Sequence, residues 1–179
     1  FHARFKALPP AKVPGRDTKD DWRRIQRGEP ERRVKAGSRG EEGESVVLGY
    51  VAPWDPASLL SLERHAEQLT HVAADWFTLT GVDATLNEEA SDKVRLLCVR
   101  NGIGFLPILR NLDGSDWQPE AVESLAKGSP TERAAFIDRL ISRLPPGSTG
   151  VLVEWSQLDP ASKKEVAGLL GEMASRLHA

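Results

Sequence analysis

The stretch that decides the fold is Val46-Val47-Leu48-Gly49-Tyr50-Val51-Ala52, which is closed by Pro53-Trp54-Asp55-Pro56. An uncharged apolar run of this length is typical of a β-strand buried on both faces, because a half-exposed strand would alternate apolar and polar residues. A helical period follows at once, on the face formed by Leu59, Leu62, Ala66 and Leu69. The stretch therefore predicts a strand–helix unit that begins at residue 46.

The same kind of unit recurs along the rest of the chain. Further apolar strand runs are predicted at residues 72–79, 103–109 and 150–156. Helices are predicted at 88–100, at 119–144 with a break at Gly128-Ser129-Pro130, and from Asp159 onward. Strands that alternate with helices form a parallel sheet joined by right-handed crossovers. The predicted fold class is therefore α/β.

Two architectures fit this series of units. One is the first four strand–helix units of a (β/α)8 TIM-type barrel, whose strands lie side by side in the order 1-2-3-4. The other is a self-contained doubly wound sheet, whose strand order reverses at a switch point, as in 2-1-3-4. Periodicity alone leaves both open.

Residues 1–45 differ from the rest in composition. They carry 12 Lys and Arg against 8 Asp and Glu, and prolines and glycines interrupt any helix. Residues 46–179 carry 12 basic and 18 acidic residues. We expect an irregular, flexible linker at 1–45 that precedes one folded domain at 46–179. The acidic balance of that domain argues against nucleic acid as its partner.

No motif points to a metal or a cofactor. The single cysteine, Cys98, lies in an apolar helical run and is expected to be a core residue. His65 and His71 lack metal-ligand spacing. The pair of glycines in Gly102-Ile103-Gly104 precedes a strand, which is the wrong order for a dinucleotide loop. We therefore expect neither a metal nor a cofactor.

Several landmarks resemble glycoside hydrolase family 18. Gly49-Tyr50-Val51-Ala52-Pro53-Trp54 looks like the G-Y-x-x-x-W start of those barrels, and Gly150–Ser156 has the shape of their D-x-x-D-x-D-x-E strand. Residues 61–71, Asp75-Trp76-Phe77 and 106–111 are similar to a bacterial subset fused to a polysaccharide deacetylase and a membrane glycosyltransferase. The resemblance covers about residues 46–179. It implies the first half of a chitinase-like barrel, and hence a fragment that is incomplete at its C-terminus.

The strand that carries the family's acids departs from the active pattern. Laid onto that pattern, the four acidic positions fall on Thr149, Leu152, Glu154 and Ser156. The resemblance implies that the last position holds the catalytic acid, and a serine hydroxyl cannot serve as one because its pKa lies far above neutrality. The resemblance also implies that an Asp two residues before the acid orients the N-acetyl group of the substrate. Glu154 occupies that position and is a weak candidate for a replacement acid.

The candidate substrate-binding residues are Tyr50, Trp54, Trp76, Asn111, Trp155 and Gln157. Aromatic rings can stack on pyranose faces, although Trp is also a common core residue. Core packing is the better interpretation of Trp155. Asn111 is explained as well by turn chemistry as by ligand binding.

The resemblance implies a degenerate carbohydrate-binding module without efficient hydrolysis. Its partner would be a polysaccharide or an N-acetylated oligosaccharide, bound on the extracytoplasmic side of a bacterial membrane to which other segments attach it. The parent would be an enzyme that modifies or synthesises polysaccharide. Two alternatives stay open: a doubly wound interaction domain without sugar chemistry, and a weak glycosidase that uses Glu154.

Overall fold

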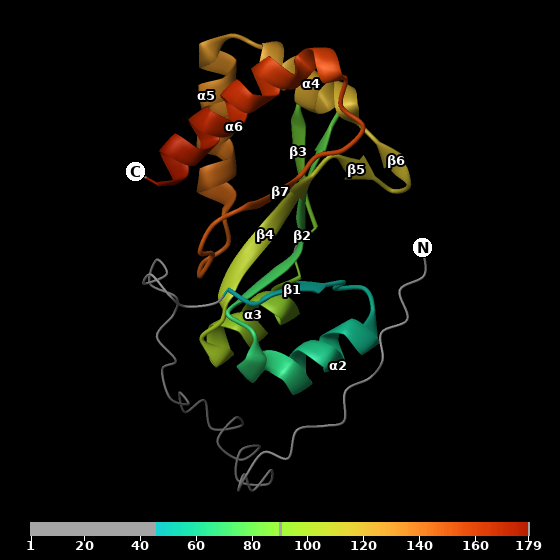
Figure 1. The fold of residues 1–179 in the computed structure, drawn as a ribbon, viewed down its shortest axis with the longest axis vertical. Coiled ribbons are helices and arrows are strands. Elements are labelled where there is room, and N and C mark those ends of the chain that lie inside the picture. Colours follow the sequence, from blue (N-terminus) through green and yellow to red (C-terminus); the bar gives the residue numbers. More distant parts are fainter. Residues whose placement is uncertain (1–45, 90, 179) are drawn as a thin grey trace, which may run out of the picture. The chain divides into compact units, whose positions relative to one another are not determined.

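The computed structural model describes residues 46–89 and 91–178, so the linker expected at 1–45 lies outside the described residues. A parallel sheet runs through the described part in the order β1-β2-β4-β7 (Figure 1). Its strands are β1 (Leu48–Val51), β2 (His71–Thr80), β4 (Gly104–Arg110) and β7 (Leu152–Glu154). The predicted order of neighbouring strands is confirmed. The doubly wound alternative is wrong, because no reversal of strand order occurs within this sheet.

Two helices cover one face of this sheet. They are α2 (Pro56–His65), continued by the short helix η1 (Ala66–Gln68), and α3 (Asp92–Asn101). Asp55 caps α2 by accepting a hydrogen bond from the backbone N–H of Ala57 at 2.9 Å. Gly102 ends α3 in the left-handed conformation, with φ of 68°. Leu62, Val94 and Cys98 point from these helices into the core, as predicted for Cys98.

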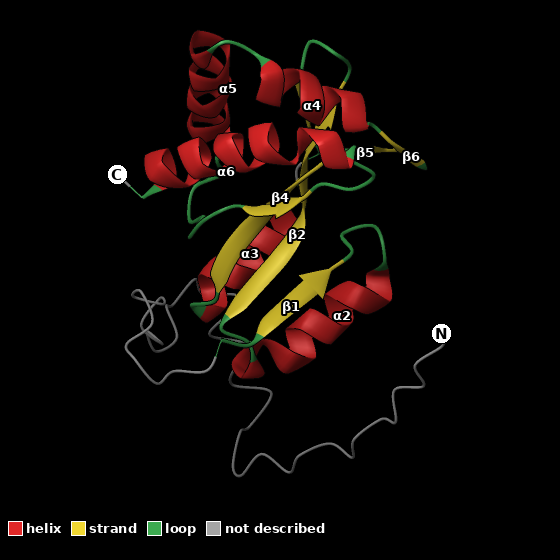
Figure 2. Cartoon of the chain, turned by 45° about the horizontal axis from the view of Figure 1, so that its top comes forward, coloured by secondary structure: helices red, strands yellow, loops and turns green. Residues whose placement is uncertain are grey.

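Three helices form a separate layer beyond the C-terminal ends of β2 and β4 (Figures 1 and 2). They are α4 (Pro119–Lys127), α5 (Pro130–Arg143) and α6 (Lys163–Leu177), the last preceded by the short helix η2 (Pro160–Ser162). The predicted break at Gly128-Ser129-Pro130 is confirmed. Ser129 and Glu132 start α5 with a reciprocal capping box. Arg133 of α5 and Glu172 of α6 join two of the helices through hydrogen bonds of 2.8–3.1 Å.

Two short hairpins were not predicted from the sequence. β3 (Thr85–Glu88) folds back antiparallel on the end of β2, and β5 (Leu112–Asp113) pairs with β6 (Asp116–Trp117). The helix predicted from residue 88 therefore begins at Asp92 instead. Arg139 and Arg143 of α5 hold the β2–β3 hairpin, because they donate to the backbone carbonyls of Ala84 and Leu86.

A β-bulge interrupts the pairing of β2 with β4. Asp75 pairs with Ile108, and Phe77 pairs with the next residue, Leu109, so Trp76 is one residue too many. Trp76 and Phe77 are both buried in the core cluster.

The strands present different side chains to their two faces. The face toward α2 and α3, here called the helix-covered face, carries core residues such as Val72, Ala74 and Phe105. The opposite face, here called the inner face, carries the alternate residues of the same strands. It includes Ala73 and Ile108, which are buried but do not belong to the core cluster.

Candidate functional site

The inner face gathers charged side chains where the parallel strands end. Asp75 comes from β2, Arg110 from β4 and Glu154 from β7. Arg110 pairs with Glu154 across neighbouring strands. Asp75 pairs with Ile108, which lies two residues before Arg110 on β4. The Nη1 atom of Arg110 lies 2.6 Å from Oδ2 of Asp75, and its Nη2 atom lies 3.9 Å from Oε2 of Glu89. We call Asp75, Glu89, Arg110 and Glu154 the charged cluster. Parallel strands bring their C-terminal ends to one edge, which is where barrel sites form.

Asp75 is the most shielded carboxylate of this cluster. Its side chain is 13% exposed and that of Arg110 is 16% exposed, whereas the side chain of Glu89 is 73% exposed. Burial raises the pKa of Asp75 above its ordinary value, against the lowering effect of Arg110. The carboxylates of Glu154 and Glu89 raise this pKa further. Asp75 and Glu89 both pair with the guanidinium group of Arg110. With Glu154 the cluster holds three carboxylates and one cation, so it is negatively charged when fully ionised.

A shallow depression of about 340 Å³ opens beside the cluster, lined by Pro53, Trp54, Asp75, Glu89 and Ser91. Trp54 lies in the loop after β1 and is 69% exposed. The loop is anchored by the Asp55 cap and by a hydrogen bond of 3.0 Å from the backbone N–H of Ala52 to Oγ of Ser58. The depression therefore combines an exposed ring with a shielded carboxylate.

Tyr50 adds a second exposed aromatic side chain, at 64% exposure. It pairs with Ala73, which lies two residues before Asp75 on the same strand. Because residues two apart in a strand share a face, Tyr50 belongs to the inner face with Asp75. The predicted residues Tyr50, Trp54 and Glu154 are thus placed on one side of the sheet, together with Asp75 and Arg110.

Other candidates take part in the protein's own packing. Trp76 is 3% exposed, donates from Nε1 to Glu88 Oε1 at 3.0 Å, and packs edge-to-face on Phe105 with ring centroids 5.4 Å apart. Trp155 packs against the core, as expected, and its buried indole N–H has no hydrogen-bond partner among the described residues. Neither ring is exposed to solvent to the extent that the ring of Trp54 is.

Asn111 and Ser156 form a clamp at the end of β7. The Asn111 amide donates to the backbone carbonyl of Ser156 at 3.0 Å and accepts from the backbone N–H of Ser156 at 2.9 Å. Asn111 is fully buried, so its side chain holds the chain in place here. β7 ends at Glu154, and Ser156 follows beyond it, partly buried. Gln157 is exposed, with a left-handed backbone φ of 59°.

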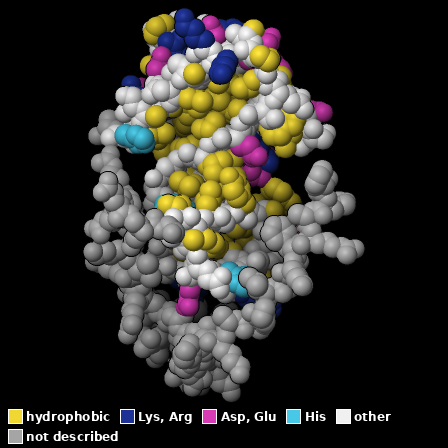
Figure 3. All heavy atoms as spheres, in the orientation of Figure 1, with side chains coloured by type: hydrophobic (Ala, Val, Ile, Leu, Met, Phe, Trp, Pro, Cys, Tyr) yellow, Lys and Arg dark blue, Asp and Glu magenta, His cyan; other side chains and the backbone are white. Residues whose placement is uncertain are grey.

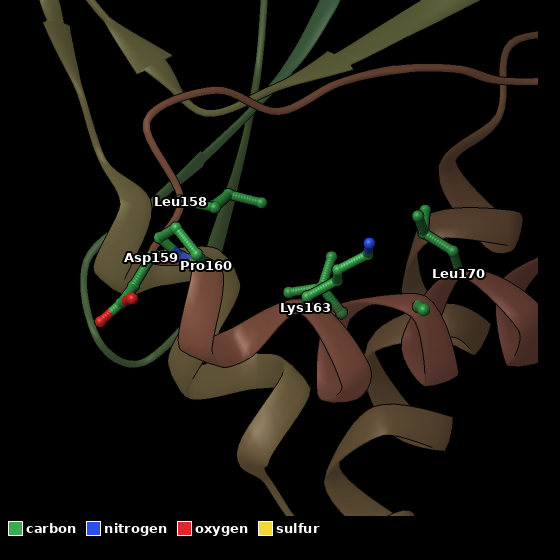
Figure 4. Close-up of a pocket in the computed structure, with 7 residues that line it drawn as sticks. Leu158, Asp159, Pro160, Lys163 and Leu170 are labelled. Carbon is green, nitrogen blue, oxygen red and sulfur yellow. The ribbon is translucent and has the colours of Figure 1, made fainter.

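A second depression, also about 340 Å³, lies between the segment before α6 and α6 itself (Figure 4). Its lining is almost entirely apolar, from Leu158, Pro160, Val166, Ala167 and Leu170, with Lys163 and Asp159 at its edge. Figure 3 shows hydrophobic side chains gathered in two areas of this side of the molecule, with acidic and basic side chains between them. The apolar depression offers surface for packing but few groups for chemistry.

Sequence reasoning missed Asp75, Glu89 and Arg110. The available signal was one acidic residue inside an apolar strand run and one basic residue at the end of another. Charges in buried strands are costly unless they are paired, so each implied a partner. Among residues 46–89 and 91–178, no group of three His, Cys, Asp or Glu could hold a metal ion. None of the described helices is long and apolar enough to cross a membrane.

The fold is similar to that of several solved chitinase structures. A class V chitinase from Pseudomonas fluorescens Pf-5 shares 14% identity at a TM-score of 0.67, over 75% of this chain and 42% of that one. A chitinase from Chromobacterium violaceum shares 16% identity at a TM-score of 0.62, over 75% of this chain and 43% of that one. The spore cortex-lytic enzyme SleL of Bacillus megaterium shares 18% identity at a TM-score of 0.64, over 73% of this chain and 31% of that one. No family model and no curated protein matches the chain.

These likenesses define the class of fold. The chain is a mixed α/β protein with a curled parallel sheet, a half-barrel resembling the TIM-type domains of family 18-like chitinases. It spans less than half the length of the solved chains it resembles. At 14–18% identity the similarity establishes the fold and leaves the activity to the site's own residues.

Proposed function

We propose that this chain is a carbohydrate-binding sector of a larger chitinase-like barrel, without efficient hydrolysis. The observation that carries the proposal is the exposed pair Tyr50 and Trp54, next to the charged cluster at the C-terminal ends of the strands. Rings of this kind bind sugar faces, while charged and amide groups at the rim bind hydroxyls. The ligand class we propose is an N-acetylated oligosaccharide or polysaccharide.

The loss of hydrolysis is argued from Ser156. It stands where the family resemblance expects the catalytic acid, and a neutral hydroxyl cannot protonate a leaving oxygen. Removal of general acid catalysis alone costs about 10²–10⁴-fold in rate. A weak glycosidase that uses Glu154 is the second candidate, favoured by the exposure of Glu154 beside Arg110 on the inner face.

The wider context is also part of the proposal. In it, further strands complete the barrel, and the parent protein modifies or synthesises polysaccharide on the extracytoplasmic side of a bacterial membrane. Support comes from the sequence resemblance to deacetylase and glycosyltransferase fusions, and from solved chains that extend well beyond the matched part. The downstream reading frame tests this context directly.

Binding of N-acetylchitotriose, measured by calorimetry, tests the ligand. Trp54→Ala and Tyr50→Ala should each weaken binding by about 1–3 kcal/mol, the scale of stacking on planar ligands, because each removes a ring from the inner face. Val82→Ala is the matched control, since Val82 is 71% exposed on the turn between β2 and β3. Binding that is unaffected by both ring substitutions would contradict the proposed site.

Turnover of the same trisaccharide tests the chemistry. We expect the wild type to turn over the trisaccharide about 10²–10⁴-fold more slowly than an enzyme that has the general acid. The double variant Glu154→Asp with Ser156→Glu restores the last two acidic positions of the family pattern and should gain some cleavage if the rest of the barrel is supplied. Efficient wild-type cleavage that Glu154→Gln abolishes would establish the glycosidase instead.

A further inference from the structure

The depression beside β1 contains one charged group that the ring-stacking proposal does not use. Asp75 lines it, and the Oδ2 atom of Asp75 accepts from Arg110 at 2.6 Å. The other oxygen, Oδ1, has no hydrogen bond to a described side chain or backbone group in the structure. A shielded carboxylate with one oxygen engaged and one available is suited to accept a hydrogen bond from a ligand.

We propose that Asp75 is the ligand-binding carboxylate of this depression: a pyranose ring stacks on Trp54, and a hydroxyl or amide N–H at its edge donates to Asp75. This inference rests on the proposed function and deepens it. Arg110 acts as a positioning residue, because its bond to Oδ2 fixes the carboxylate and leaves the other oxygen for the sugar. Glu89 also lines the depression, but its side chain is mostly exposed and its contact with Arg110 is longer, at 3.9 Å.

Asp75 accepts such a bond best when it is ionised, so binding should depend on pH. The charged groups that face it are Arg110 from β4, Glu154 from β7 and Glu89 from the segment after β3. Burial and the two glutamates raise the pKa of Asp75, and Arg110 lowers it. Affinity should therefore fall on acidification, and should begin to fall at a higher pH than for an ordinary aspartate.

The experiment is calorimetry of the whole chain with N-acetylchitotriose, from pH 7 down to the limit of folding. Asp75→Asn should weaken binding about ten- to hundredfold at neutral pH, the value of a hydrogen bond to a charged group, and should flatten the pH dependence. The matched control is Glu63→Gln, which makes the same change of charge on the exposed surface of α2, outside the depression, and should alter affinity less than about threefold.

Arg110→Gln tests the positioning role through the pH dependence of binding, which would not change if Arg110 only stabilised the fold. Removal of the cation that lowers the pKa of Asp75 should shift the midpoint of the binding–pH curve upward, and Arg110→Lys should restore most of the shift. Should Asp75→Asn fail to fold, the wild-type carboxyl can be followed by NMR. Saturation with N-acetylchitotriose should then lower the pKa of Asp75, because the sugar binds the ionised form.

The outcomes separate the two proposals. Wild-type binding that Trp54→Ala weakens but Asp75→Asn and pH leave unchanged would overturn the role of Asp75 and keep the proposed function. An Asp75 pKa that does not respond to saturating sugar would overturn it as well. A wild-type chain that binds no trisaccharide at any pH would overturn both.

Discussion

The two faces of the parallel sheet use the same strands for different purposes. On β2 the residues Val72 and Ala74 enter the core, whereas Asp75 joins the charged cluster on the inner face. The helix-covered face is apolar and close-packed, and the inner face carries exposed rings and ion pairs. In the proposed function, the helix-covered face stabilises the fold and the inner face binds the ligand.

The carboxylates of the molecule divide in a similar way. Burial raises the pKa of Asp75 on the inner face. In the helical layer, hydrogen bonds from Ser129 lower the pKa of Glu132, and hydrogen bonds from Arg133 lower the pKa of Glu172. In the helical layer the surroundings of Glu132 and Glu172 thus favour the ionised carboxylate. The surroundings of Asp75 instead favour the protonated form.

The largest expected effect comes from truncation of the helix-covered face. Phe105→Ala should destabilise the protein by about 3–5 kcal/mol, because Phe105 is fully buried and its removal leaves a cavity. Leu106→Ala, one residue along and on the inner face, should cost less than about 2 kcal/mol, since Leu106 is partly exposed. Urea unfolding of the two variants measures the difference in free energy of unfolding. Equal losses of stability would contradict the difference between the two faces.

A smaller effect is expected at the clamp that joins β4 to the end of β7. Asn111→Ala removes two hydrogen bonds and leaves the partly buried backbone groups of Ser156 unsatisfied, so it should cost about 2–3 kcal/mol. Ser156→Ala keeps the same backbone groups and should change stability by less than about 0.5 kcal/mol. A large loss from Ser156→Ala would instead assign a structural role to its hydroxyl.

The helical layer should respond to loss of its capping box. Ser129→Ala removes the hydroxyl that accepts from the Glu132 N–H, and about 1 kcal/mol of stability should be lost. Ser175→Ala is the control, because Ser175 is an exposed residue within α6. Thermal unfolding followed by circular dichroism gives both values, and the sugar affinity of Ser129→Ala should equal that of the wild type.

The smallest expected effect is a pair of opposite trends with pH. The folded-state pKa of Glu132 is lowered, so its stabilisation is lost on acidification below the ordinary value of 4.5, and Glu132→Gln should gain relative to wild type. The pKa of Asp75 is raised above 3.8, so its protonation stabilises the folded wild type, and Asp75→Asn should lose relative to wild type. Free energies of unfolding, measured from pH 7 down to the lower limit of folding, test both signs. Changes of the same sign in the two variants would contradict this difference between the two carboxylates.

The sequence predicts the helix-covered face better than the inner face. Apolar runs marked all four parallel strands, and the break at Gly128-Ser129-Pro130 separated α4 from α5 as expected. The β2–β3 hairpin escaped prediction because its turn is stabilised by distant arginines of α5. Tertiary contacts of this kind leave no local pattern.

The candidate site was predicted only in part, for a reason of register. Tyr50 and Trp54 could be proposed from a motif, and the structure displays both rings. The meeting of Asp75 with Arg110 depends on how β2 aligns with β4, which the sequence of either strand does not specify. Trp76 looked equivalent to Trp54 in the sequence, and the bulge turns it into the core instead.

The bulge at Trp76 also bears on how this strand can change length during evolution. In a regular strand, loss of one residue reverses the side chains of everything that follows. Here Asp75 and Thr78 lie on the inner face and Phe77 on the opposite one, so deletion of Trp76 would restore ordinary alternation without reversing either half. Homologous chains one residue shorter at this point would therefore keep both the site and the hairpin beyond it.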